Sequence, residues 1–185
     1  MGPYIKLTNR LVLRVENETK AKEVLALYQR NRFEFESFEP TRPANFYTLD
    51  YHINALRREY KAYTLGTFLR YYIYSADNMS KIIGAVNFNL YRYGETPYAE
   101  IGYKMDSLNQ RRGYTFEACT AAIDVISTEY GINRIDARIH PDNVASIGLA
   151  AKMGFKPLCL EPQSANILGK NVDIIRYTLD TSHIQ

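Results

Sequence analysis

Residues 98–122 read YAEIGYKMDSLNQRRGYTFEACTAA, and this stretch contains a strand, a turn and the first part of a helix. The segment from Tyr98 to Met105 is rich in aromatic and apolar residues, which is typical of a β-strand. From about Arg112 onward the apolar residues recur at helical spacing, namely Cys119, Ala122, Ile123, Ile126 and Tyr130. The pattern therefore predicts a strand that leads through a polar turn into a helix.

The turn at residues 110–115, QRRGYT, has the chemistry of an anion-binding site. The first backbone N–H groups of a helix have no partner within the helix and carry partial positive charge, so they bind phosphate well. Gly113 has no side chain that would keep a phosphate from the backbone, and Arg111 and Arg112 add charge and two-point hydrogen bonding. A plain strand–helix turn with two solvated arginines is the alternative.

A second strand and a second helix follow the first pair. Residues 133–139 have the pattern of a strand, and the sequence HPDNVAS at 140–146 opens a helix. Two parallel strands joined by a helix form a crossover unit, and ligands of such units bind beyond the carboxyl ends of the strands. We therefore expect Met105, the 110–115 turn and residues 143–146 to lie close together.

This order of elements, together with the segments AEIGY, NQRRGYTFEA and RIHPDNVASIGLAAKMGF, resembles the GNAT superfamily of acyl-CoA N-acyltransferases. The similarity is greatest to the bacterial ribosomal-protein-alanine N-acetyltransferase branch. It covers most of the chain and is weakest from Ala44 to Gly66. The resemblance implies an α/β (α+β) GNAT fold in one domain over residues 1–185, with a mixed central sheet of about six to seven strands, about four flanking helices and a parallel β-α-β unit that binds acyl-CoA.

The resemblance also implies acetyl-CoA as the co-substrate, whereas the scattered histidines His52, His140 and His183 predict no metal. In the family, a Gln-x-x-Gly-x-Ala/Thr turn binds the pyrophosphate of coenzyme A, and an Asn-x-x-Ser pair faces the thioester. The backbone of the preceding strand pairs with the pantetheine arm, and an N–H near Met105 would stabilise the oxyanion. The binding residues so implied are Tyr103, Lys104, Met105, Gln110, Arg111, Arg112, Gly113, Tyr114, Thr115, Asn143 and Ser146.

Two residues are candidates for the chemistry of acetyl transfer. Glu100 is the candidate base, because many family members hold a Glu here and burial would raise its pKa. A strand glutamate that pairs with a basic neighbour is the alternative. Many members hold a proton-donating Tyr where this chain has Ala150, so the resemblance implies Ser146 as the donor to the leaving thiolate. A helix-start serine bonded to the backbone is the alternative.

Three functions remain open from the sequence. The first is acetylation of a protein N-terminal amine by direct attack, without a covalent enzyme intermediate. The second is acetylation of a small amine, such as a polyamine, an amino acid or an aminoglycoside, and the third is non-catalytic binding of acyl-CoA. Glu34, Glu36 and Glu39 alternate with three phenylalanines and could attract a cationic acceptor, whereas a solvated turn is the alternative.

Composition narrows the class of protein. The chain has 185 residues, of which 46% are hydrophobic, and its net charge of +3 does not demand DNA as a partner. The N-terminus lacks a secretory pattern, and no apolar run approaches the ~20 residues that cross a bilayer, so we expect a cytoplasmic protein without a membrane partner. The expected assembly is a monomer or a homodimer. Cys119 and Cys159 are expected to be buried thiols, and the histidines lack metal-ligand spacing.

The remaining residues predict further elements. Expected helices cover residues 17–29 and 46–65, and His52 is expected on the solvated face of the second one. The segment 32–40 is expected to be a loop. Expected strands cover residues 11–15, 68–75, 81–93, 155–160 and 172–179, with a turn at 94–97.

Overall fold

The computed structural model describes residues 4–91 and 96–182, and these form one eight-stranded sheet with five α-helices. The strands, in sheet order, are β1 (Ile5–Leu7), β2 (Leu11–Arg14), β3 (Phe68–Ser75), β4 (Gly84–Tyr91), β5 (Tyr98–Met105), β6 (Arg134–Ile139), β8 (Lys170–Asp180) and β7 (Lys156–Ile167). The helices are α1 (Ala21–Arg30), α2 (Arg32–Glu36), α3 (Leu49–Thr64), α4 (Tyr114–Thr128) and α5 (Val144–Lys152), with short 3-10 turns at Glu18–Lys20 and Ser107–Asn109. The predicted mixed fold is confirmed, with more strands and helices than expected.

One pair of neighbouring strands is parallel within the described sheet. β5 pairs with β6 in parallel, and α4 connects them, whereas the other neighbours are antiparallel. The predicted strand at Tyr98–Met105 has the predicted bounds. The β-α-β unit around which the sequence is organised therefore lies at the centre of the sheet.

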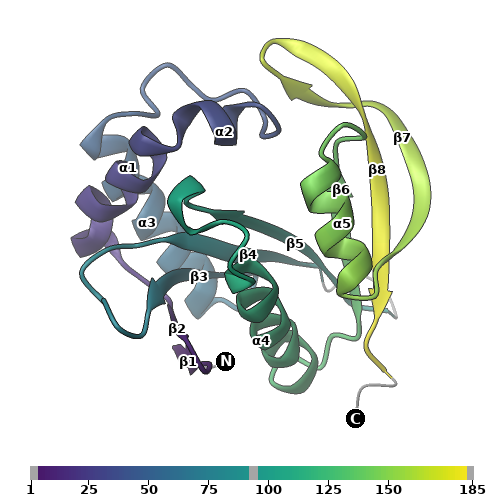
Figure 1. Ribbon diagram of the computed structural model, residues 1–185, viewed down its shortest axis with the longest axis horizontal. Coiled ribbons are helices and arrows are strands. Elements are labelled where there is room, and N and C mark those ends of the chain that lie inside the picture. The colour runs from purple at the N-terminus through teal and green to yellow at the C-terminus, as the bar shows by residue number, and fades with distance from the viewer. Residues whose placement is uncertain (1–3, 92–95, 183–185) are drawn as a thin grey trace.

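Helices cover both faces of the sheet (Figure 1). The larger core joins α4 and α5 to the inward-facing residues of β2 through β6 and β8. The smaller core joins α1, α2 and α3 to the opposite face of β3 and β4. Because side chains alternate along a strand, Ile101, Tyr103 and Met105 of β5 face α4 and α5, whereas Glu100 and Lys104 face the other way.

Three elements differ from the expected secondary structure. β1 was not expected, because three residues are too few to show an alternating pattern. The expected loop at 32–40 begins with α2, a helix of only five residues, which is too short for a 3.6-residue period. β7 continues through the expected loop after residue 160 and forms a long hairpin with β8, with bulges in its register.

Two side chains have surroundings opposite to those expected. His52 is buried rather than solvated, because its ring stacks on Tyr28 and contacts Phe46. Burial lowers the pKa of His52 to about 4, so this histidine is neutral at pH 7. Cys159 is exposed rather than buried, because it lies on the outermost strand of the sheet, whereas Cys119 is buried as expected. The expected turn residues Gly94 and Glu95, and Arg92 and Tyr93 of the expected strand, lie outside the described residues.

The first prediction concerns the close approach of β4 and β5. A Cβ atom added at Gly84 would lie 2.6 Å from the carbonyl oxygen of Lys104, so Gly84→Ala must move one backbone away from the other. We expect Gly84→Ala to lower the free energy of unfolding by about 1–3 kcal/mol in urea denaturation. Gly148→Ala is the matched control, because a Cβ there meets no atom within 4 Å and alanine favours a helix. Equal stability of the two variants would contradict this account.

Candidate active site

The parallel strands β5 and β6 separate before β5 ends. Their pairing runs from Tyr98–Arg134 to Ile101–Ala137 and then stops, although β5 continues to Met105 beside β4. The N–H of Asp106 donates to the carbonyl of Ile83, on the β4 side, at 2.8 Å. Because successive N–H groups of a strand point to opposite edges, those of Tyr103 and Met105 face the gap. The gap therefore exposes one edge of β5 to a ligand, next to the predicted oxyanion donor.

The predicted phosphate turn lies at the start of α4, beyond the end of β5. Gly113 precedes the helix with φ at 78°, a left-handed conformation that favours glycine. Since glycine has no side chain, it places no capping group on the first N–H groups of α4, at Tyr114 and Thr115. Arg111 and Arg112 are exposed, and the Nε2 of Gln110 donates to the Met105 carbonyl at 3.4 Å.

Arg10, which the sequence did not indicate, fixes the shape of this turn from the β1–β2 connection. Its Nη1 donates to the Arg112 carbonyl at 3.0 Å, and its guanidinium lies 4.7 Å from the ring centroid of Tyr114. Its Nε also donates to Glu117 at 2.8 Å, and Glu117 accepts a further bond from Thr8. Despite burial, which acts in the other direction, these donors lower the pKa of Glu117. No local pattern could have joined residues 107 positions apart.

The Asn143–Ser146 pair lies on α5, and its serine meets a side chain from β5. The Asn143 side chain accepts the N–H of Ser146 at 3.1 Å and so caps the helix. The Ser146 hydroxyl lies 2.8 Å from the hydroxyl of Tyr103. Burial raises the pKa of Tyr103 to about 12, so its hydroxyl keeps its proton at neutral pH. The sequence analysis assigned only the backbone of Tyr103 to the candidate site. The contact with Ser146 places the Tyr103 hydroxyl in the candidate site as well.

Glu100 lies on the opposite face of the sheet from this hydroxyl pair. Its carboxylate lies 3.9 Å from the Nη1 of Arg176, and 22% of its side chain is exposed. Burial raises the pKa of Glu100, an effect that the charges of Arg138 and Arg176 oppose. The fold therefore separates the two candidate catalytic groups by the thickness of the sheet, and the β5–β6 gap is where both faces meet.

Lys104 and the acidic segment after α2 pair with each other. The Nζ of Lys104 donates to Glu39 at 2.7 Å and to the Tyr28 hydroxyl, so its side chain points away from the phosphate turn. Glu39 also binds Arg42, and Glu36 accepts the Tyr47 hydroxyl at 2.7 Å. The protein thus balances these carboxylates itself, which does not favour the idea that they attract a cationic acceptor; Glu34 is exposed.

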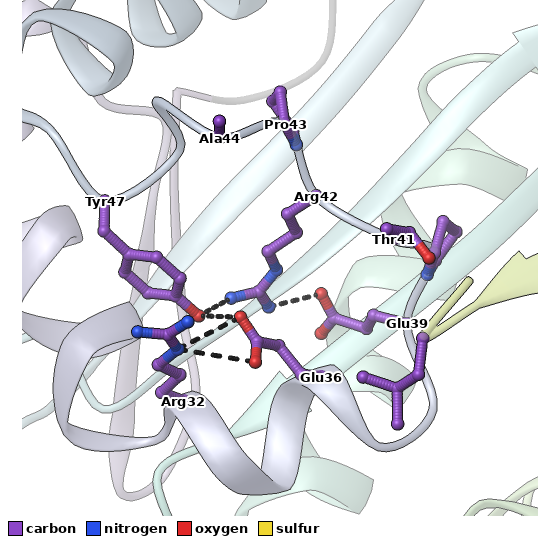
Figure 2. Close-up of a pocket in the computed structure, with 10 residues that line it drawn as sticks. Arg32, Glu36, Glu39, Thr41, Arg42, Pro43, Ala44 and Tyr47 are labelled. Carbon is purple, nitrogen blue, oxygen red and sulfur yellow. Dashed lines mark hydrogen bonds and ion pairs between the residues drawn. The ribbon is translucent and has the colours of Figure 1, made fainter.

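A cavity of about 210 Å³ lies beside the same segment rather than at the phosphate turn (Figure 2). Figure 2 shows Arg32, Arg42, Glu36 and Glu39 arranged around it. Its far wall includes Leu168, at the tip of the β7–β8 hairpin. Thr41 joins the two sides, because its N–H donates to the Asn166 carbonyl at 2.8 Å and its hydroxyl accepts the N–H of Gly169 at 3.0 Å.

The described residues contain no group of three or more His, Cys, Asp or Glu side chains that could hold a metal ion. Within the same ranges, no helix has the length and apolar character needed to cross a membrane.

Known proteins share this fold and this sequence pattern. Residues 10–156 match the family described as Acetyltransferase (GNAT) domain. The chain is 30% identical over 161 residues to ribosomal protein uS5-alanine N-acetyltransferase of Escherichia coli, an overlap that covers 83% of this chain and 79% of that protein. The chain therefore belongs to the GNAT acetyltransferase family, and the predicted N-acetyltransferase class with acetyl-CoA as the donor is confirmed.

Two solved structures have the same fold at low identity. A ribosomal-protein-S5-alanine acetyltransferase from Vibrio fischeri superposes with a TM-score of 0.90 at 21% identity, covering 99% of this chain and 100% of that one. RimJ of Mycobacterium smegmatis, in complex with CoA-disulfide, gives a TM-score of 0.87 at 19% identity, covering 94% of this chain and 83% of that one.

The second prediction tests the contact between Arg10 and the turn. Arg10→Gln removes the guanidinium that orders residues 112–114, so we expect the dissociation constant for coenzyme A, measured by calorimetry, to rise about threefold to tenfold. Since the contacts of Arg10 are with Arg112, Tyr114 and Glu117 rather than with the candidate catalytic groups, the turnover number at saturating acetyl-CoA should change little. Arg57→Gln, which removes an exposed arginine paired with Glu18, is the control and should leave the affinity unchanged. An unaltered affinity in Arg10→Gln would exclude this role.

Proposed function

We propose that this protein transfers the acetyl group of acetyl-CoA to the terminal α-amine of a polypeptide, within a single domain over residues 1–185. The observation that carries the proposal is the β5–β6 gap, which has an open strand edge, a phosphate turn at one end and the Tyr103–Ser146 pair beside it. The acceptor class is supported by the 30% identical relative, which is named for acetylating the alanine of a ribosomal protein.

On the donor side, the turn at 110–115 would hold the pyrophosphate through the first N–H groups of α4 and the two exposed arginines. The pantetheine arm would then pair with the free edge of β5 at Tyr103 and Met105. This arrangement directs the thioester into the gap, with its carbonyl oxygen near the N–H of Met105. A preorganised donor of this kind is typically worth about 3 kcal/mol of transition-state stabilisation.

The transfer itself needs one proton acceptor and one proton donor. Glu100 would take a proton from the acceptor ammonium, and the neutral nitrogen would attack the thioester carbon. The carbon–sulfur bond then breaks, and the thiolate takes a proton from the Ser146 hydroxyl. The nitrogen, which still carries one proton more than the amide product, releases that proton in the same step, and it returns to the Ser146 oxygen through solvent. The Tyr103 hydroxyl, 2.8 Å away, is protonated at neutral pH and can donate to Ser146 in turn. Because an α-amine has a pKa of about 8, it needs less help than a lysine at about 10.4.

The part of the site that would receive the amine favours an acceptor with a small cross-section, such as an extended chain end. Thr41 ties the segment after α2 to the tip of the β7–β8 hairpin by hydrogen bonds to Asn166 and Gly169. Figure 1 shows this hairpin reaching over toward the α2 side of the molecule. An extended chain end, or a small amine, can pass such a bridge more easily than a lysine on a folded surface. We further propose a cytoplasmic location, where ribosomal proteins are made, as monomer or homodimer.

The proposal is tested by following thiol release from acetyl-CoA with three sets of acceptors: peptides with free N-termini, the same peptides with blocked N-termini, and small amines. We expect release with the free peptides and little with the blocked ones. Peptides that begin with alanine should be tested first, because the 30% identical relative is named for acetylating an alanine. Turnover with polyamines or aminoglycosides alone would replace the proposal by a small-molecule enzyme. Binding of coenzyme A without turnover would leave a non-catalytic module.

The third prediction isolates the proton donor. Ser146→Ala should lower the turnover number at least about tenfold, with a modest change in acetyl-CoA affinity, because only the departing thiolate needs the hydroxyl. Tyr103→Phe keeps the ring and removes the partner hydroxyl, so a smaller loss is expected. Thr128→Ala is the control, because among residues 4–91 and 96–182 the hydroxyl that it removes is bonded only to the carbonyl of Asp124 on α4. Unchanged turnover in Ser146→Ala would remove Ser146 from the mechanism.

A further inference from the structure

We propose that Arg176 of β8 is a positioning residue that holds the Glu100 carboxylate in place beside β8 and keeps it ionised. The inference rests on the proposed role of Glu100 as the base. Arg176 lies beyond residues 10–156, which match the family, so the C-terminal hairpin would contribute to the chemistry as well as to the sheet.

The guanidinium of Arg176 lies among three carboxylates from three other strands. Its Nη1 is 3.9 Å from an oxygen of Glu100 and 3.1 Å from the Oδ2 of Asp136, and its Nη2 is 2.5 Å from the Oε1 of Glu161. β8 pairs with β6 along the whole of β6, so this side chain extends from a fixed backbone. A planar, delocalised cation with several donors suits such a bridging position better than a lysine does.

The other two carboxylates have cations of their own. Asp136 is completely buried and receives two hydrogen bonds from Arg134, at 3.1 and 2.9 Å. Glu161 accepts a hydrogen bond from the Nε of Arg138 at 2.8 Å. Glu100 differs, because in the part of the chain that the structure describes Arg176 is the one basic group within ion-pair distance of it. Loss of Arg176 would therefore affect Glu100 more than its neighbours.

The charges that face Glu100 come from every strand around it. Burial opposes the ionised form of Glu100 most strongly, Arg138 of β6 and then Arg176 of β8 favour that form, and Glu161 of β7 and Asp136 of β6 oppose it further. Tyr91 of β4 also faces the carboxylate and is protonated near neutral pH. Without Arg176, two negative groups and one positive group would remain. The pKa of Glu100 would then rise, and at neutral pH more of the enzyme would hold a protonated base.

The fourth prediction is read from the pH dependence of kcat/KM for the acceptor. A protonated base is inactive, so activity falls as pH drops through the pKa of Glu100. We expect Arg176→Gln to move this acidic limb upward by about one pH unit, with recovery at higher pH and an unchanged KM for acetyl-CoA. Arg176→Lys keeps a charge but loses the planar fork, so an intermediate shift is expected.

Arg134→Gln is the matched control, because Arg134 and Arg176 both bind the Oδ2 of Asp136 but only Arg176 forms an ion pair with Glu100. The control should leave the acidic limb in place, and urea denaturation should show that each variant is folded. If Arg176→Gln does not fold, the inference is tested by Arg176→Lys, in which we expect an intermediate shift of the acidic limb. An acidic limb that does not move in either variant, or that moves equally in Arg134→Gln, overturns the inference.

Glu100→Gln separates this inference from the proposed function. We expect it to abolish the acidic limb, and to make a second change at Arg176 nearly silent, because both residues act through one carboxylate. If Glu100→Gln abolishes the limb while Arg176→Gln leaves it in place, the role of Arg176 is wrong and the base assignment stands. If Glu100→Gln leaves rate and limb intact, the base assignment fails, and the role of Arg176 fails with it.

Discussion

The end of hydrogen bonding between β5 and β6 is the constraint on which the rest of this structure depends. After Ile101 and Ala137 the strands no longer pair, although each continues. Unpaired backbone N–H and C=O groups in the centre of a sheet are costly unless a ligand or water satisfies them. The fold accepts this cost at one place, and that place lies beside the phosphate turn, the Tyr103–Ser146 pair and Glu100. A ligand that pairs as a strand would restore the missing hydrogen bonds.

In the proposed function, the gap would also explain how one active site can use both faces of a sheet. In the proposed function, α4 and α5 would hold the donor on one face, and α2, on the other face, would border the acceptor together with the β7–β8 hairpin that reaches toward it (Figure 1). Alternation along β5 points Tyr103 to the first face and Glu100 to the second. A thioester in the gap would therefore meet its proton donor from one side and the amine from the other. This separation would keep the two proposed proton transfers apart.

Paired charges recur around the proposed site. Arg10 and Glu117 hold the phosphate turn, Lys104 and Arg42 neutralise Glu39, and Arg176 lies among three carboxylates. Apart from Arg10, which is exposed, these groups are buried or partly buried, where an uncompensated charge would be costly. Each cation therefore contacts a backbone segment or a carboxylate as well as balancing charge. The exposed Arg111 and Arg112 differ, since they extend into solvent beside a helix start that has no capping side chain.

The sequence by itself determined the β5–α4–β6–α5 unit, its glycine turn and the Asn143 cap, because these depend on local periodicity and on residues a few positions apart. The family followed from the same local motifs. Only the tertiary structure decided what Arg10, Tyr103, Arg176 and His52 touch, since each meets partners from elements distant in the chain. It also decided that α2 is a short helix and that Cys159 is exposed on an outer strand. Periodicity reports which face of an element is apolar, but it carries no information on which distant side chain completes a charge or a hydrogen bond.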